Sequence, residues 1–132
     1  MTFGKCNIKE KRWFLNGEAL VEEDQITHLG VILANDNNTH TNSRVLAMRK
    51  AFYALQGSGL CPKGSNPATV AHIFKAAIKP VLTFGMECIY QSKAVINTAQ
   101  STLAKLLKTT LGLRSYSRST PLLKALDIET LQ

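Results

Sequence analysis

The sequence has 132 residues and a mass of 14.5 kDa, the size of a single domain. Hydrophobic residues make up 45% of it and charged residues 19%, which excludes a disordered composition. No uncharged apolar run approaches the ~20 residues that span a bilayer, and no cationic start precedes an apolar segment, so we expect no membrane partner and no signal peptide. The three cysteines lack CxxC spacing, which favours a reducing, intracellular compartment, nuclear or cytoplasmic.

Charge is distributed unevenly along the chain. Residues 1–37 carry four basic and six acidic side chains, whereas residues 38–132 carry twelve basic and three acidic ones. The two parts have net charges of −2 and +9, which together give the +7 of the whole chain. A basic segment of this length predicts a polyanionic partner, most often a nucleic acid. The alternative is a solvated basic surface with no such partner.

The first third of the chain predicts short β-strands. Asn16-Gly17 is a strong turn dipeptide between two short apolar runs, which indicates a hairpin. Residues 25–33 alternate as a third strand would, and the face expected to meet a core consists of Leu29, Val31 and Leu33. Gly30 within this strand predicts a bulge or a close approach by another backbone.

Everything after residue 38 is expected to be helical. A first helix over residues 41–56 has apolar residues at three- and four-residue steps, namely Val45, Met48, Phe52 and Leu55. A second begins at Ser65-Asn66-Pro67, where a capping residue precedes proline, and Pro80 should kink or end it. A third covers residues 92–111 with Gly112 at its C′ position, and a short fourth begins at Ser119.

These elements predict an α+β chain. A small N-terminal β-hairpin or three-strand piece occupies residues 1–37, and a three- to four-helix bundle occupies residues 38–132. A bundle of this size can bury a modest core, whereas an isolated hairpin is marginal in water. We therefore expect the apolar strand residues to pack on the helices or on a partner sheet outside this chain.

Catalytic motifs are missing from the sequence. The acids at residues 18–24 are typical of a solvated turn, and the three histidines have no neighbouring ligand at metal-binding spacing. No glycine-rich phosphate loop followed by Lys-Ser or Lys-Thr occurs. A hydrolase that uses Cys88 with His72 is the least favoured hypothesis, because Cys88 is expected to be a buried structural cysteine.

The basic residues of the predicted helices are the strongest functional candidates. Pairs spaced three or four apart share a helix face, and a loop of donors near residue 116 suits phosphate oxygens. Lys105 and Lys108 form one such basic pair, on the third helix. The residues that we expect to contact nucleic acid are Arg44, Arg49, Lys50, Lys75, Lys79, Arg114 and Arg118.

Three segments together resemble the reverse transcriptases of non-LTR (LINE-type) retrotransposons. Phe3-Gly4-Lys5 and the hairpin around Asn16-Gly17 are followed by His28-Leu29-Gly30-Val31, which is similar to the "(Y/H)-L-G-V" primer grip at the end of the palm. Residues 78–87 contain Pro80, Leu82, Phe84, Gly85 and Glu87, in the pattern "P-x-L-x-Y/F-G-x-E" of the helical region that follows. The resemblance covers nearly the whole chain, in the same order of hairpin and helices.

The resemblance implies the last palm strands and the thumb of such a polymerase. Thr27, His28, Leu29 and Gly30 would form the primer grip, and the basic helices would lie along an RNA–DNA or DNA primer–template duplex, with the remainder of the palm as a second partner. The family's catalytic aspartates precede this region, and no Asp-Asp pair occurs here. The implied function is therefore non-catalytic, with no cofactor in this chain and Mg²⁺ held by residues of the parent polymerase that are absent from it.

A second hypothesis is a free-standing basic helical adaptor, or a nucleic-acid-binding module without polymerase context. It predicts a strand edge over residues 25–33 that is covered within the chain, and a weak affinity for nucleic acid if the basic face binds protein. The primer–template hypothesis instead predicts sequence-tolerant binding that falls steeply with salt.

Overall fold

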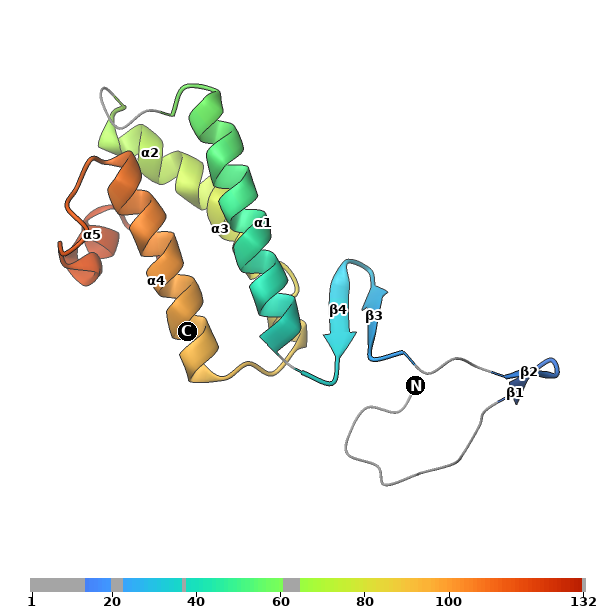
Figure 1. Cartoon of the computed structure of the whole chain (residues 1–132). Coiled ribbons are helices and arrows are strands. Elements are labelled where there is room, and N and C mark those ends of the chain that lie inside the picture. The colour runs from blue at the N-terminus through green and yellow to red at the C-terminus, as the bar shows by residue number, and fades with distance from the viewer. Residues whose placement is uncertain (1–13, 20–22, 37, 61–64, 132) are drawn as a thin grey trace.

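The computed structural model describes residues 14–19, 23–36, 38–60 and 65–131. Two antiparallel hairpins precede the helices, so the chain is α+β as predicted (Figure 1). The first hairpin pairs β1 (Phe14–Leu15) with β2 (Glu18–Ala19), and the second pairs β3 (Gln25–His28) with β4 (Val31–Ala34). The last strand ends at Ala34 and the first helix begins at Asn38.

Asn16 and Gly17 form the predicted turn of the first hairpin. Their φ angles are 52° and 84°, so both central residues adopt the left-handed conformation that a two-residue type I′ turn requires. The predicted flanking residues 12, 13, 20 and 21 lie outside the described residues.

The prediction of one continuous strand over residues 25–33 is wrong. Leu29 and Gly30 have φ angles of 49° and 78°, so they form a second type I′ turn and His28 pairs with Val31 across it. Leu29 is 83% exposed at this turn and faces no core. Gly30 is a turn residue and not a mid-strand bulge, although another segment does approach it closely.

Helix α1 (Asn38–Gly57) begins three residues before its predicted start. Met48 and Phe52 are buried, and Val45 and Leu55 pack on the same core. Helix α4 (Lys93–Thr110) closely matches its predicted range, and Gly112 follows it with a φ of 65°. Helix α5 (Ser119–Ala125) places Leu123 in the core. Figure 1 shows α1 and α4 with their N-terminal ends toward the same end of the bundle.

The second predicted helix is one rod made of three parts. Asn66 caps α2 (Pro67–Ile73), a π-helical turn η1 (Phe74–Ile78) follows, and α3 (Lys79–Thr83) completes it. Pro80 does not end the helix, because the wider π turn ends only two residues before it, at Ile78, and relieves the constraint of a residue without an N–H. The rod ends at Thr83, after which Gly85 takes a φ of 73°.

The core lies between α1, this rod and α4. Phe52 and Phe74 meet edge to face with ring centroids 6.1 Å apart. The fully buried residues of the rod recur every four positions, and they are Val70, Phe74, Ile78 and Leu82. Leu103 and Leu107 of α4 close the core from the opposite side.

Candidate nucleic-acid interface

The tip of the β3–β4 hairpin holds the four residues predicted as a primer grip. Thr27 and His28 are exposed in β3, and Leu29 and Gly30 form the exposed turn. Leu29 is unusual, because a bulky residue at positive φ costs about 1–2 kcal/mol. The tip is therefore a strained and accessible turn that carries an exposed leucine.

Arg44 supports the tip from helix α1. Its Nη2 donates a hydrogen bond to the Gly30 carbonyl oxygen at 2.9 Å, and its guanidinium lies 5.0 Å from the centroid of the Phe84 ring. A Cβ atom on Gly30 would lie 3.2 Å from Phe84 Cε1, so only glycine allows this approach without displacement. Arg44, a predicted phosphate contact, thus binds within the chain.

His40 joins three segments beside this contact. Its Nδ1 accepts a hydrogen bond from the Ile32 N–H at 3.1 Å, and its Nε2 lies 2.9 Å from the Phe84 carbonyl oxygen. Because Nδ1 accepts and a carbonyl can only accept, Nε2 carries the proton and the ring is neutral. The side chain is 1% exposed. A Cβ on Gly85 would lie 2.8 Å from His40 Nε2, so this link also depends on glycine.

Sequence reasoning missed His40 because a lone histidine on a helix has no motif. One signal was present, since His40, Arg44, Met48 and Phe52 recur every four residues along α1 and extend its buried stripe toward the helix start. Arg44 and His40 therefore belong to the same face of α1 as the core, and this face fixes the hairpin to the bundle.

Lys75 and Lys79 are paired with acids from the end of the chain. Lys75 Nζ lies 2.8 Å from Asp127 Oδ2, and Lys79 Nζ lies 2.9 Å from Glu129 Oε2. The hydrogen bond and the charge of each lysine lower the pKa of its partner carboxyl. These two predicted contacts are thus largely neutralised on the surface.

The remaining basic residues divide into engaged and free ones. Lys108 is buried and donates to the Ser115 carbonyl oxygen at 3.2 Å, while Arg114 donates to the Tyr116 hydroxyl and lies 5.8 Å from its ring centroid. Within the described ranges, the exposed basic residues that form no ion pair include Arg49, Lys50, Lys105 and Arg118. Arg49 and Lys50 are adjacent on α1.

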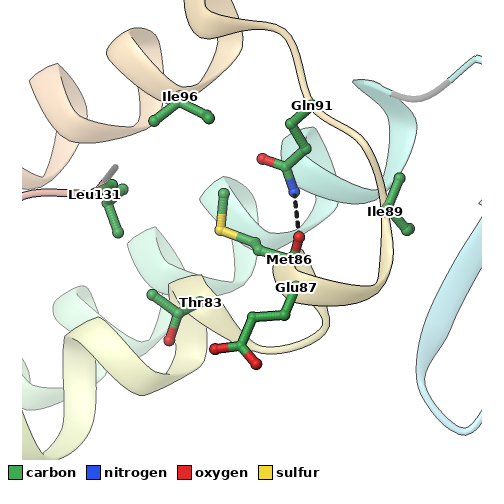
Figure 2. Close-up of a pocket in the computed structure, with 7 residues that line it drawn as sticks. All are labelled: Thr83, Met86, Glu87, Ile89, Gln91, Ile96 and Leu131. Carbon is green, nitrogen blue, oxygen red and sulfur yellow. Dashed lines mark hydrogen bonds between the residues drawn. The ribbon is translucent and has the colours of Figure 1, made fainter.

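A pocket of about 250 Å³ lies between the α3–α4 connection, helix α4 and the end of the chain (Figure 2). Its side chains include Met86, Glu87, Gln91, Ile96 and Leu131. Gln91 Nε2 donates to the Met86 carbonyl oxygen at 3.4 Å, and Figure 2 shows its Oε1 turned away from that atom. Because Glu87 gives the pocket a negative charge and the rest is mainly apolar, it does not suit a phosphate.

The residues of the thiol hypothesis are both exposed. The expectation that Cys88 is buried is wrong, because it lies in the short 3₁₀ turn η2 (Met86–Cys88) on the surface. His72 is exposed on α2. Among the residues that the structure describes, no three His, Cys, Asp or Glu side chains are grouped to hold a metal ion.

Comparison with models of protein families, with curated proteins and with solved structures found no match to this chain. No helix in the described segments combines the length and hydrophobicity needed to cross a lipid bilayer.

Proposed function

We propose that this chain is a non-catalytic part of a retrotransposon reverse transcriptase, an RNA-directed DNA polymerase, and that it grips the primer–template duplex. The main support is that the two motifs resembling that family meet in space, although the contacting residues Gly30 and Phe84 are 54 positions apart in the sequence. Gly30 of the first motif is packed against Phe84 of the second, Val31 approaches Gly85, and Arg44 binds both motifs. Each motif contributes a glycine to this contact, Gly30 from the first and Gly85 from the second, and a side chain at either position would crowd the other motif or His40.

In this function the hairpin and helix α1 have different tasks. The exposed turn at Leu29 and Gly30 would hold the primer end through its backbone, and His40 and Arg44 would act as positioning residues that fix the turn to the bundle. Arg49 and Lys50 would contact phosphates, which positions a duplex without reading its sequence. The Mg²⁺ of the parent polymerase would be held by carboxylates outside this chain.

The proposal predicts salt-dependent binding of an RNA–DNA primer–template. Fluorescence anisotropy with a labelled 20-base-pair hybrid, measured from 50 to 300 mM KCl, should give a logarithmic slope of about −2, since each phosphate contact contributes about −0.9. Single-stranded and scrambled-sequence probes would measure shape and sequence preference.

A charge-matched pair of variants would localise the binding. Arg49→Glu/Lys50→Glu should weaken binding at least about tenfold, whereas Lys93→Glu/Lys124→Glu, which changes the net charge equally, should weaken it less than about threefold. Equal losses would show a diffuse charge effect and contradict the grip. No salt-dependent binding at all would favour the free-standing helical adaptor.

Translation of the DNA upstream of Met1 is an independent test, because an aromatic-Ala-Asp-Asp motif in frame is expected there.

A further inference from the structure

A groove of about 320 Å³ runs between the N-terminal halves of α1 and α4. Its apolar walls are formed by Val45 and Leu46 of α1 and by Val95 and Ala99 of α4. Ala99 is completely buried, whereas Leu46 is 57% exposed. An exposed leucine beside a hollow surface is the pattern of an anchor site for apolar side chains of a partner.

The groove also contains a buried polar group without a partner. Thr41 lines it and is 0% exposed, and its Oγ1 forms no hydrogen bond within the described structure. Leaving such a buried hydroxyl unpaired is unfavourable, because the group has lost its hydrogen bonds to water. The contact between α1 and α4 therefore leaves this hydroxyl unsatisfied beside the groove.

The electrostatics around the groove favour a negative partner. Neither α1 nor α4 contains an aspartate or glutamate, and Arg49 projects at the groove without an ion pair among the described residues. The two helices run in the same direction (Figure 1), so their positive N-terminal dipole ends lie at the same end of the groove. The two effects add.

We propose that this groove docks an amphipathic helix of a partner protein, with an apolar stripe flanked by carboxylates. Apolar side chains and polar ones, namely Asn42, Arg49 and three threonines, line the groove together, so a peptide that offers both apolar and acidic side chains fits better than a phosphate backbone alone. The α1 wall runs from Thr41 to Arg49, about 12 Å or two helical turns at 1.5 Å per residue. Two or three anchors at i, i+3 or i+4, and i+7 would fill this length. This inference does not depend on the polymerase function.

A designed peptide provides the probe. It has 18 residues, leucines at alternating three- and four-residue steps, and glutamates along both sides of that stripe. A second peptide replaces each glutamate by lysine, and a third has the acidic composition in scrambled order. Binding to the full chain would be measured by anisotropy of the labelled peptides and by amide chemical shifts. We expect the acidic helix to bind at least about tenfold tighter than either comparison peptide.

Matched variants separate the groove from general attraction to a basic protein. Leu46→Asn should weaken the acidic helix at least about fivefold, whereas Leu15→Asn, at a leucine that is 64% exposed in β1, should change it less than about twofold. Arg49→Glu should weaken it more than Arg118→Glu, which makes the same charge change elsewhere. Chemical shifts should change over residues 41–49 and 95–102.

The proposal is overturned if the scrambled peptide binds equally well, if Leu46→Asn and Leu15→Asn behave alike, or if no peptide binds. If Leu46→Asn instead weakens binding of the RNA–DNA hybrid, the groove binds nucleic acid. Lys50→Glu distinguishes this inference from the duplex grip, because it should weaken the hybrid and leave the peptide unaffected.

Discussion

In the helical bundle Phe74, Ile78 and Leu107 are completely buried, whereas in the first hairpin Phe14 and Leu15 each keep 64% of their surface exposed. The second hairpin is intermediate, since β3 is exposed and β4 is half-buried. The bundle is stabilised by apolar packing, which is roughly proportional to the area removed from water. The β3–β4 hairpin depends on a few directional contacts through His40, Arg44 and Gly85. Substitutions should therefore disrupt the bundle and the hairpin separately.

The largest expected effect is in the bundle core. Phe74→Ala should lower the free energy of unfolding by about 3–5 kcal/mol, because it leaves a cavity beside Phe52. Phe14→Ala removes the same ring from an exposed strand and should change the free energy of unfolding by less than about 0.5 kcal/mol. Urea unfolding followed by circular dichroism compares the two. Similar losses would mean that β1 packs on the bundle in solution.

The second effect concerns the attachment of the β3–β4 hairpin. Gly85→Ala combines a positive φ, which costs about 1–2 kcal/mol, with contacts of 2.8 Å to His40 Nε2 and Val31 Cγ2. Gly17→Ala has the same kind of φ, +84°, but nothing within 4 Å. Gly85→Ala should therefore destabilise the chain more than Gly17→Ala does, and it should speed amide hydrogen exchange at Ile32. Unchanged exchange there would contradict the role of His40.

A smaller effect of opposite sign is expected at the turn. Leu29→Asn should stabilise the β3–β4 hairpin by up to about 1 kcal/mol, because asparagine tolerates the left-handed conformation better than leucine. Hydrogen exchange at Val31, or thermal unfolding of the whole chain, would detect it. If the turn serves as a primer grip, the same variant should also change primer–template affinity. A destabilised hairpin would show that Leu29 makes contacts that the structure does not contain.

The smallest effect concerns the exposed ion pair of Asp127 with Lys75. The hydrogen bond and charge of Lys75 lower the pKa of the Asp127 carboxyl in the folded chain. Its contribution to stability is therefore present above the unfolded pKa and disappears as the pH falls through the folded pKa. Asp127→Asn, which suits the φ of 53° at this position, should be less stable than the original chain at pH 7 and equally stable at pH 2. A difference that persists at pH 2, or that is insensitive to 1 M salt, would contradict this origin.

Local signals predicted the helices well. Asn66-Pro67 fixed the start of α2 through a side-chain cap, since Asn66 Oδ1 accepts from the Ala68 N–H at 2.9 Å. Gly112 marked the end of α4, and the stripe around Met48 and Phe52 identified the buried face of α1. These features act over one or two helical turns, so the sequence contains them directly.

Features that depend on distant residues were not predictable in the same way. The turn at Leu29 was missed because leucine is a poor residue for positive φ, and the contacts that support the turn, Gly30 with Phe84 and Arg44 with the Gly30 carbonyl, come from distant residues. The pairing of Lys75 and Lys79 joins residues 52 and 50 positions apart. Helical spacing placed both lysines on one face, but nothing local indicated that acids from the end of the chain would cover it.

The π-helical turn Phe74–Ile78 has a consequence for rotational phase. In a regular α-helix a four-residue step advances about 40° beyond one full turn, so a repeat of buried residues every four positions would drift around the axis. The wider π turn reverses part of this drift, which is why Val70, Phe74, Ile78 and Leu82 can all face the core. Deletion of one residue within the turn would rotate everything after it by about 100°. Phe84 and Gly85 would then point away from the hairpin. The one extra residue that the π turn accommodates therefore sets the direction in which the second motif faces.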